Sequence, residues 1–343
     1  MAAQPPHATP PLKIKTLDSP NKNAESLYEL VFTRQPAVLA TPGFPQPLQH
    51  PTKKKYNIRA VDGKGLAMFA TDDIDVGELI VCERPLVMLQ QLVDLPMSFI
   101  RNSSKEAIMQ AAMKKTERRL ESLIAKMHSK FREQYMSLVN SHHHDGSGPL
   151  HGRMRTNAFG MRDFYNPEGE KHTCSVVGNE ISRVNHSCCP NSNFSFHRPS
   201  FAMELRATRY IPKGTEITVN YCGRLEPCKD RQKLIQHYGF TCDCPACKDP
   251  ISSDNFRDVL VRTVDNMLKN DRTTLEDVLI FITKIEDFGL EGTWYYIRCL
   301  LFVEQSYRMK GMKEESKAYR NRVYKHTLAL AGRGDVMHAI ASF

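Results

Sequence analysis

A short cysteine-rich loop places the strongest constraint on how this chain can fold. Cys242, Cys244 and Cys247 follow one another as C-x-C-x-x-C, and Pro245 stiffens the loop between them. Three thiolates so close in sequence can converge on one metal ion, and a structural zinc ion takes four ligands in a tetrahedron. The fourth ligand must come from another segment, and the Cys188-Cys189 pair is the nearest polar, turn-rich candidate. A zinc site is therefore favoured over three free thiols.

The residues around Cys188 indicate strands joined by tight turns. Taken alone, Asn185-His186-Ser187-Cys188 is compatible with a simple turn, since Asn and Ser are common turn formers. Residues 210–219 then follow as a strand, a Pro-Lys-Gly turn and a second strand, and Tyr221 stands just after that second strand. Apolar and aromatic residues typical of strands flank the Asn-His-Ser-Cys segment on both sides: Val176, Val177, Phe194, Phe196 and Phe201.

In this order and spacing, the motifs resemble a SET domain, the fold of the protein lysine methyltransferases. The resemblance rests on Asn185-His186-Ser187-Cys188, on Val219-Asn220-Tyr221, and on the C-x-C-x-x-C loop, which is similar to a post-SET zinc site. Residues 62–70 and 76–80 resemble the opening strands of the domain, so the resemblance covers about residues 58–248. It points to the SET-MYND type, in which the cysteine of Asn-His-Ser-Cys joins the C-x-C-x-x-C loop.

The resemblance implies a mainly β SET fold, with small antiparallel sheets and a knot-like C-terminal segment. A helical insertion, a post-SET-like zinc knuckle and an α-helical C-terminal region complete the expected fold class. The resemblance also implies a structural zinc ion held by Cys188, Cys242, Cys244 and Cys247. The cysteine-rich MYND finger is missing, because no cysteine occurs between Cys82 and Cys174.

By the same resemblance, we expect the chain to bind S-adenosylmethionine and to methylate a lysine side chain of a protein substrate, histone or non-histone. Lys64 and Gly65 are expected to offer backbone contacts to the cofactor, and Asn185 and His186 an amide and an imidazole group. Arg183 replaces a residue that is usually apolar in the family. The other expected cofactor contacts are Asn157, Ser182, Arg183, Tyr221 and Phe240.

The chemistry of methyl transfer explains why such residues are needed. A sulfonium methyl is already electrophilic, so the protein mainly has to align a neutral amine with it. A free lysine has a pKa of ~10.4 and must lose a proton first, which desolvation in an apolar channel favours. Tyr221 is the expected catalytic residue, since its hydroxyl can orient the amine or polarise the methyl group. Tyr238 and Phe240 are expected to form aromatic walls that attract the sulfonium and exclude water.

Composition and periodicity divide the chain into four regions. Residues 1–55 carry ten of the twenty prolines and are expected to form a disordered arm. The SET domain is expected over residues 56–223, with a helical insertion at about 95–150, because apolar residues there recur every three or four positions. A zinc-binding segment over 224–250 precedes a helical region over 251–343. The helices of that region are expected at 255–269, 274–287, 293–309 and 313–331. A stabilising cap and an interaction surface are equally compatible with them.

Charge and hydropathy argue against several other classes of protein. The net charge of +9 comes without a basic stripe with interleaved aromatics, which disfavours direct nucleic-acid binding. A DNA-binding zinc protein is disfavoured because no recognition helix carries paired cysteines and histidines. No apolar run approaches the ~18 residues that cross a bilayer, and no secretory signal is recognisable. The clustered cysteines fit a reducing compartment, so we expect an intracellular protein of the nucleus or cytoplasm.

One alternative to an enzyme remains open, a SET-fold interaction module that keeps its zinc and has lost catalysis. The intact Asn185, His186 and Tyr221 favour the enzyme, since a scaffold would not need them. Residues 142–144 are three consecutive histidines before a Gly-Ser stretch. Adjacent histidines rarely share one ion in good geometry, so we expect an exposed loop there rather than a second metal site.

Overall fold

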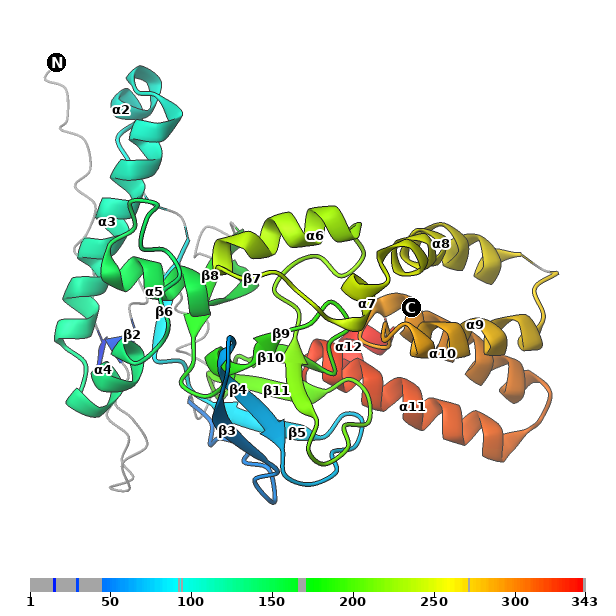
Figure 1. Cartoon of the computed structure of the whole chain (residues 1–343). Coiled ribbons are helices and arrows are strands. Elements are labelled where there is room, and N and C mark those ends of the chain that lie inside the picture. Colours follow the sequence, from blue (N-terminus) through cyan, green and yellow to red (C-terminus); the bar gives the residue numbers. More distant parts are fainter. Residues whose placement is uncertain are drawn as a thin grey trace, which may run out of the picture. The chain divides into compact units, whose positions relative to one another are not determined.

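The structure is a computed structural model that describes residues 15–16, 29–30, 45–91, 93, 95–165, 171–270 and 272–341 (Figure 1). Most of the predicted arm over residues 1–55 therefore lies outside the described residues. The chain divides into two compact units, one containing Leu86–Val177 and the other formed by Pro45–Pro85 and Gly178–Phe343. In the N-terminal region, β1 (Lys15–Thr16) pairs antiparallel with β2 (Glu29–Leu30).

The unit containing Leu86–Val177 combines a three-stranded sheet with four helices. The antiparallel sheet has the order β6 (Val87–Gln90), β8 (Lys171–Val177), β7 (Phe159–Tyr165). The helices are α2 (Met97–Asn102), α3 (Lys105–Ala125), α4 (Ser129–Met136) and α5 (Pro149–Asn157).

The apolar periodicity of this unit forms its core, as predicted. Leu120, Ile124, Tyr135 and Leu138 are all buried in one cluster. The buried hydroxyl of Tyr135 donates to the carbonyl of Leu150 over 2.8 Å, so the polar end of this core residue is satisfied. Within the predicted helical insertion, α3 and α4 are separate helices, because His128 starts a new helix by accepting a hydrogen bond from the N–H of Lys130.

The second unit contains a four-stranded sheet, and several residues of the candidate site lie on this sheet or directly after its strands. Its strand order is β3 (Tyr56–Val61), β4 (Gly65–Ala70), β12 (Glu216–Val219), β9 (Asn185–His186). Neighbouring strands are antiparallel except β12 and β9, which pair in parallel and bring distant segments together. The β3–β4 hairpin turns through Gly63 and Gly65 at φ 72° and 68°, a region that other residues enter only with strain.

A second sheet of this unit has the order β10 (Ser192–His197), β11 (Ala202–Ala207), β5 (Leu79–Glu83). Every residue of β11 is buried, including the charged Glu204 and Arg206. Their charges are compensated, because the Glu204 carboxylate lies 3.1 Å from Arg206 Nη2 and 2.7 Å from Arg333 Nε. Arg333 follows α11 (Lys313–Ala331), so this ion pair joins the C-terminal helical region to the sheet.

The remaining helices follow β12, except the short η1 (Ile181–Arg183), and the largest of them form their own apolar core. The largest are α8 (Pro250–Lys269), α9 (Leu275–Asp287), α10 (Trp294–Met309) and α11 (Lys313–Ala331), so the four helices predicted there are confirmed. Leu260, Val278, Ile282 and Leu300 are buried between them. The shorter elements are η1 (Ile181–Arg183), α6 (Cys228–Ile235), η2 (Gln236–Tyr238), α7 (Pro245–Lys248) and α12 (Val336–Ala341).

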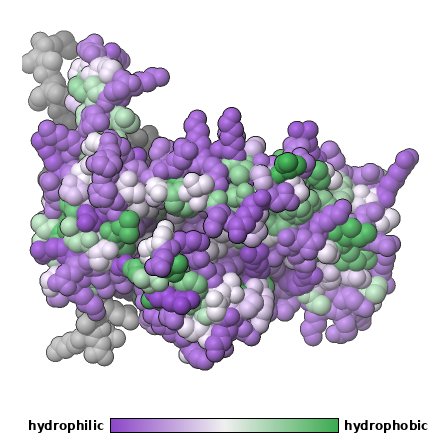
Figure 2. All heavy atoms as spheres, in the orientation of Figure 1, coloured by the Kyte–Doolittle hydropathy of each residue, from purple (hydrophilic) through white to green (hydrophobic). Residues whose placement is uncertain are grey.

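Apolar side chains also reach the surface of this helical region. In Figure 2 most of the visible face is hydrophilic, and apolar residues gather over α8. Ile251, Val259 and Val261 of that helix are exposed, Ile251 by 74%. Within the described part of the chain, no helix is both long and apolar enough to cross a membrane.

Candidate functional site

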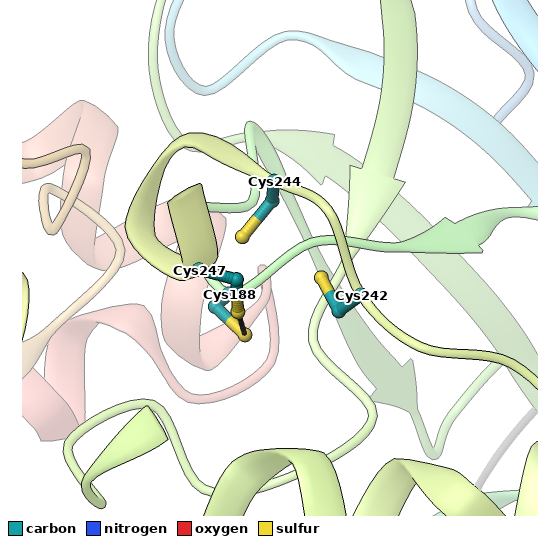
Figure 3. A group of neighbouring side chains, drawn as sticks. All are labelled: Cys188, Cys242, Cys244 and Cys247. Atoms are coloured by element: carbon teal, nitrogen blue, oxygen red, sulfur yellow. Dashed lines mark hydrogen bonds between the residues drawn. The ribbon is translucent and has the colours of Figure 1, made fainter. Parts of the chain in front are cut away.

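Four cysteines from two distant segments meet in the second unit (Figure 3). The sulfur atoms of Cys188, Cys242, Cys244 and Cys247 all lie within 4.8 Å of one another. These are the four residues predicted to hold zinc. The Sγ atoms of Cys188 and Cys247 are 3.6 Å apart, well beyond a disulfide bond of about 2.05 Å, and all ten cysteines are free thiols.

The donor set fits a structural zinc ion. Four thiolates in a closed group are the ligands of structural tetrahedral sites, whereas catalytic zinc keeps one position open for water or substrate. The local fold turns the sulfurs inward, because the carbonyl of Cys244 accepts from the N–H groups of Cys247 and Lys248 at the start of α7, over 2.8 and 3.0 Å. The cluster therefore has the composition and the spacing of a zinc knuckle.

Helix α6 supports this cysteine loop from one side. The side-chain amide of Gln232 donates to the carbonyl of Cys242 over 2.8 Å and accepts from its N–H over 3.0 Å. Ile235, one turn later, is fully buried against the cysteines. On the other side, the guanidinium of Arg257 donates to the carbonyl of Cys188 over 3.0 Å. Both segments that carry the thiols are thus fixed by side chains of neighbouring helices.

His186 connects the cysteine cluster to Tyr221. Its Nδ1 atom accepts a hydrogen bond from the backbone N–H of Tyr221 over 2.9 Å. Because a backbone N–H can only donate, Nδ1 is unprotonated and the neutral ring carries its proton on Nε2. Nε2 lies 3.3 Å from Cys188 Sγ and donates to that sulfur. Both ring nitrogens therefore have partners within the protein, and the contact of His186 with the cofactor stays a prediction.

Tyr221 follows β12 and lies among aromatic rings. Its hydroxyl donates to the carbonyl of Val184 over 2.6 Å. Its ring centroid is 4.8 Å from that of Tyr238 and 5.3 Å from that of His186. Burial raises the pKa of the Tyr221 phenol, and the neighbouring Tyr238 and Glu216 raise it further. Tyr221 is consequently a neutral hydroxyl at neutral pH.

Asn185 is placed by the pairing of β9 with β12. Asn185 pairs with Thr218 and His186 with Val219 in this parallel register. The side-chain amide of Asn185 donates to Glu216 Oε1 over 2.9 Å, which fixes the amide beside the first residue of β12. The predicted cofactor contacts Asn185 and His186 are thereby brought together with Tyr221.

Ser182 and Arg183 lie in η1, just before β9. The hydroxyl of Ser182 accepts from the N–H of Gly178 over 2.9 Å, and Arg183 Nε donates to the carbonyl of Asn179 over 2.9 Å. Burial lowers the pKa of the Arg183 guanidinium. Both side chains thus stabilise the turn that leads into Asn185.

Glu83 holds the same turn and was not identified from the sequence. Its carboxylate accepts from the N–H groups of Asn179, Glu180 and Ile181, over 3.2, 3.0 and 2.7 Å. Burial nevertheless raises the pKa of Glu83 to about 7, because it outweighs the lowering by these backbone donors. The only signal in the sequence is an acidic residue at the end of an apolar strand, and that signal does not reveal its partners.

The hairpin turn at Lys64 lies beside the cysteine loop. Lys64 Nζ is 3.6 Å from the carboxylate of Asp243, and a Cβ atom added at Gly65 would meet nothing within 4 Å. Phe240 is 36% exposed, and its ring centroid lies 6.3 Å from that of His186. Lys64, Gly65 and Phe240 therefore belong to the same neighbourhood as His186 and Tyr221, with open space at the glycine.

Two other sequence candidates lie in the unit containing Leu86–Val177. Asn157 donates its amide to the carbonyls of Val139 and Arg153 over 2.6 and 2.7 Å, and its contact with the cofactor stays a prediction. In the histidine loop, His143 and His144 are exposed, as expected, whereas His142 is buried and its Nδ1 lies 2.6 Å from Asp145. No metal-binding cluster includes these histidines among the described residues.

Comparison with known proteins places part of the candidate site, including Asn185, His186 and Tyr221, within a known domain. The model of the SET domain matches residues 65–222. N-lysine methyltransferase SMYD2-A of Xenopus laevis is 30% identical over 168 residues, which cover 46% of this chain and 36% of that protein. Histone-lysine N-methyltransferase set5 of Schizosaccharomyces pombe is 28% identical over 193 residues, covering 56% of this chain and 50% of that protein.

The chain thus spans half or less of the length of these two relatives. Among solved structures, the SET domain of LSMT bound to lysine and AdoHcy covers 84% of this chain and 95% of its own, at 12% identity and a TM-score of 0.31. That likeness is too slight to support an argument about the site. The matched residues include the motifs at residues 185–188 and 219–221. Residues 65–222 are therefore a SET domain, and parts of the chain are similar to these lysine methyltransferases.

Proposed function

We propose that this chain is an S-adenosylmethionine-dependent methyltransferase that acts on a lysine side chain of a protein. One observation carries the proposal: Tyr221 meets Asn185 and His186 at the parallel pair of β9 and β12. More than thirty residues of sequence separate Tyr221 from the other two. The names of the relatives support the same reaction class, since two of them are lysine methyltransferases.

When bound, S-adenosylmethionine supplies a methyl group on a positively charged sulfur. The chain offers aromatic faces suited to such a cation, because the rings of Tyr221 and Phe240 lie beside His186 and the ring of Tyr238 lies beside Tyr221. The turn at Lys64 and Gly65 offers backbone that a ligand can approach closely, since the glycines carry no side chain. Asn185 offers an amide oxygen next to these groups.

The raised pKa of Tyr221 decides the role that its hydroxyl can play. A neutral phenol cannot remove a proton from an ammonium group at neutral pH, so Tyr221 is not the general base. Its proton is directed at the carbonyl of Val184 over 2.6 Å, which leaves the oxygen lone pairs to accept from an amine or from the polarised methyl group. We assign to Tyr221 the orientation of the reacting groups, while desolvation favours the neutral amine.

The cysteine cluster has a structural task in this proposal. Cys188, Cys242, Cys244 and Cys247 would hold a zinc ion with no open position, so the metal would supply folding energy and no Lewis acid. Through Cys188 and the imidazole of His186, the cluster is connected to the backbone of Tyr221. The metal site would thereby fix the strand end at which methyl transfer takes place.

Methyl transfer from a labelled cofactor to a proteome extract tests the proposal. We expect label on lysine side chains, identified by mass spectrometry, and loss of label with Asn185→Ala. The matched control is His143→Ala, an exposed residue of the other unit, which should keep full activity. A wild-type protein that neither binds the cofactor nor transfers label would instead be the interaction module.

A further inference from the structure

Two arginines lie fully buried beside the cysteine cluster. Arg231 of α6 is 0% exposed and Arg257 of α8 is 1% exposed, and they are among the largest fully buried side chains of the described chain. A guanidinium keeps its charge in proteins, and burying a charge costs several kcal/mol unless it is paired or hydrogen-bonded. The hydrogen-bond partners of each guanidinium therefore decide whether its burial is compensated.

All three nitrogens of Arg257 have partners. Nε donates to the carbonyl of Arg224 over 2.8 Å, Nη2 donates to the carbonyl of Cys188 over 3.0 Å, and Nη1 donates to the hydroxyl of Ser253. Arg257 thus fixes the backbone of one cysteine and needs no further acceptor.

Arg231 is only partly satisfied. Its Nη1 donates to Asp254 Oδ1 over 3.0 Å and to the carbonyl of Glu226. Its Nε and Nη2 atoms are buried and have no hydrogen-bond acceptor among the described residues. Two buried donors without an acceptor are rare on one cation. They indicate that the group that accepts from them is in a different chemical state in the complete site.

The orphaned donors belong to the face of α6 that meets the thiols. Ile235, four residues after Arg231, packs directly against the buried cysteines, and residues four apart share one face of a helix. Cys188 and Cys247, whose sulfur atoms lie 3.6 Å apart, belong to the group of cysteines against which this face of α6 packs.

We propose that Arg231 donates hydrogen bonds from Nε and Nη2 to the metal-bound thiolates of Cys188 and Cys247, and so positions the ligands of the zinc site. Four thiolates and one Zn²⁺ carry a net charge of about −2, and the positive charges of two buried arginines lie beside them, one of which is also paired with Asp254. A metal-bound thiolate is a far better acceptor than the neutral thiol, so the donors find their acceptors when the metal binds. The inference rests on the zinc site proposed above.

Zinc affinity, measured by competition with a chromogenic chelator, tests the role of Arg231. Arg231→Met keeps an apolar stem of similar length and removes the donors, so we expect the zinc affinity to fall about 10- to 100-fold, as for other ligand-orienting residues. The matched control is Arg262→Met, an exposed arginine of α8 that pairs with Asp258. It should keep the wild-type affinity.

Cobalt substitution separates hydrogen bonding to sulfur from a merely structural effect. Removing a donor makes a thiolate more electron-rich, so the sulfur-to-cobalt charge-transfer band should move to lower energy in Arg231→Met and stay in place in Arg262→Met. Arg231→Lys retains a charge but loses the planar fork, and we expect an intermediate shift. An unchanged band together with unchanged zinc affinity would overturn the proposal.

A cadmium-113 form of the unaltered protein covers the case in which the Arg231 variants do not fold. A scalar coupling between the metal and the Nε proton of Arg231 is expected across an N–H···S bond, and its absence in a metal-loaded protein would count against the inference. Wild-type protein that holds no metal would overturn this inference together with the zinc site. Wild-type protein that holds metal without a contribution from Arg231 would overturn the inference alone.

Discussion

The backbone N–H of Tyr221 donates to Nδ1 of His186 over 2.9 Å, and the other nitrogen of the same ring lies 3.3 Å from Cys188 Sγ. One imidazole therefore connects a cysteine of the proposed zinc site to the tyrosine proposed for methyl transfer. Because the ring tautomer is set by the Tyr221 N–H, the proton on Nε2 faces the sulfur. The metal cluster and the end of β12 are consequently parts of a single hydrogen-bonded unit.

Removal of the metal should for this reason weaken cofactor binding. Without zinc, Cys188 is no longer held against His186, and the backbone around Tyr221 loses one of its supports. We expect a chelator to lower the affinity for S-adenosylhomocysteine about tenfold, or about 1.4 kcal/mol, as measured by isothermal titration calorimetry. Adding zinc back should restore the affinity. An affinity that is the same with and without zinc would show that the metal site does not support the cofactor site.

Zinc content provides a second prediction. Elemental analysis should find one zinc ion in the wild-type protein and lose it in Cys244→Ser, because a closed site needs all four ligands. Cys228→Ser is the matched control, since Cys228 is a half-buried cysteine outside the cluster, and it should retain zinc. Equal zinc content in the two variants would show that the cysteine cluster is not the binding site.

Local sequence signals predicted much of this molecule. The C-x-C-x-x-C spacing forces three sulfurs together over six residues, and the Asn-His-Ser-Cys motif identified the fourth. The helices after residue 250 followed from apolar periodicity, and their observed starts and ends lie close to the predicted ones. These features depend on residues near one another in sequence.

The features that were missed depend on contacts that sequence spacing does not contain. The contact of His186 with the cofactor stays a prediction, but the hydrogen bonds of its imidazole to Tyr221 and Cys188 depend on the pairing of β9 with β12. Glu83 meets its partners 96 to 98 residues later. Arg231 resembles an ordinary solvated arginine in sequence, because polar neighbours surround it, and only the packing of α6 on the cysteines buries it.

Acid should destabilise the protein through His326 of α11. Burial, together with the positive charges of Arg322 and Lys325, lowers the pKa of His326 to about 3. In an unfolded chain this pKa is about 6.5. Since the folded state binds the proton less well, this stability is complete above pH 6.5 and is lost as pH falls. At pH 5 the loss amounts to about 2 kcal/mol.

Chemical denaturation of His326→Phe at several pH values measures this contribution. The variant keeps a ring against Tyr296, whose centroid lies 4.7 Å from that of His326, but it cannot take up a proton. We expect its free energy of unfolding to vary less than that of wild type between pH 7 and pH 5. His338→Gln, at an exposed position of α12, should follow the wild-type curve. Parallel curves for wild type and His326→Phe would exclude His326 as the source.

Tyr221→Phe separates chemistry from binding. The substitution keeps the ring and its packing on Tyr238 and removes the hydroxyl that donates to Val184. The lost hydrogen bond should cost about 1 kcal/mol of stability, since it leaves the Val184 carbonyl unsatisfied. If the hydroxyl orients the reacting groups, kcat should fall on the order of 100-fold, while the affinity for the cofactor changes little, because contacts specific to the transition state are lost.

The melting temperature, kcat and the affinity for the cofactor need to be measured on the same preparations. Tyr324→Phe is the matched control. Tyr324 is an exposed tyrosine of α11, 44% accessible, so the same chemical change there should alter neither kcat nor the melting temperature. A fall in melting temperature with unchanged kcat would make the Tyr221 hydroxyl a structural group. In that case the hydrogen bond to Val184 would stabilise the turn before β9, and the alignment of the amine would have to come from other residues of the site.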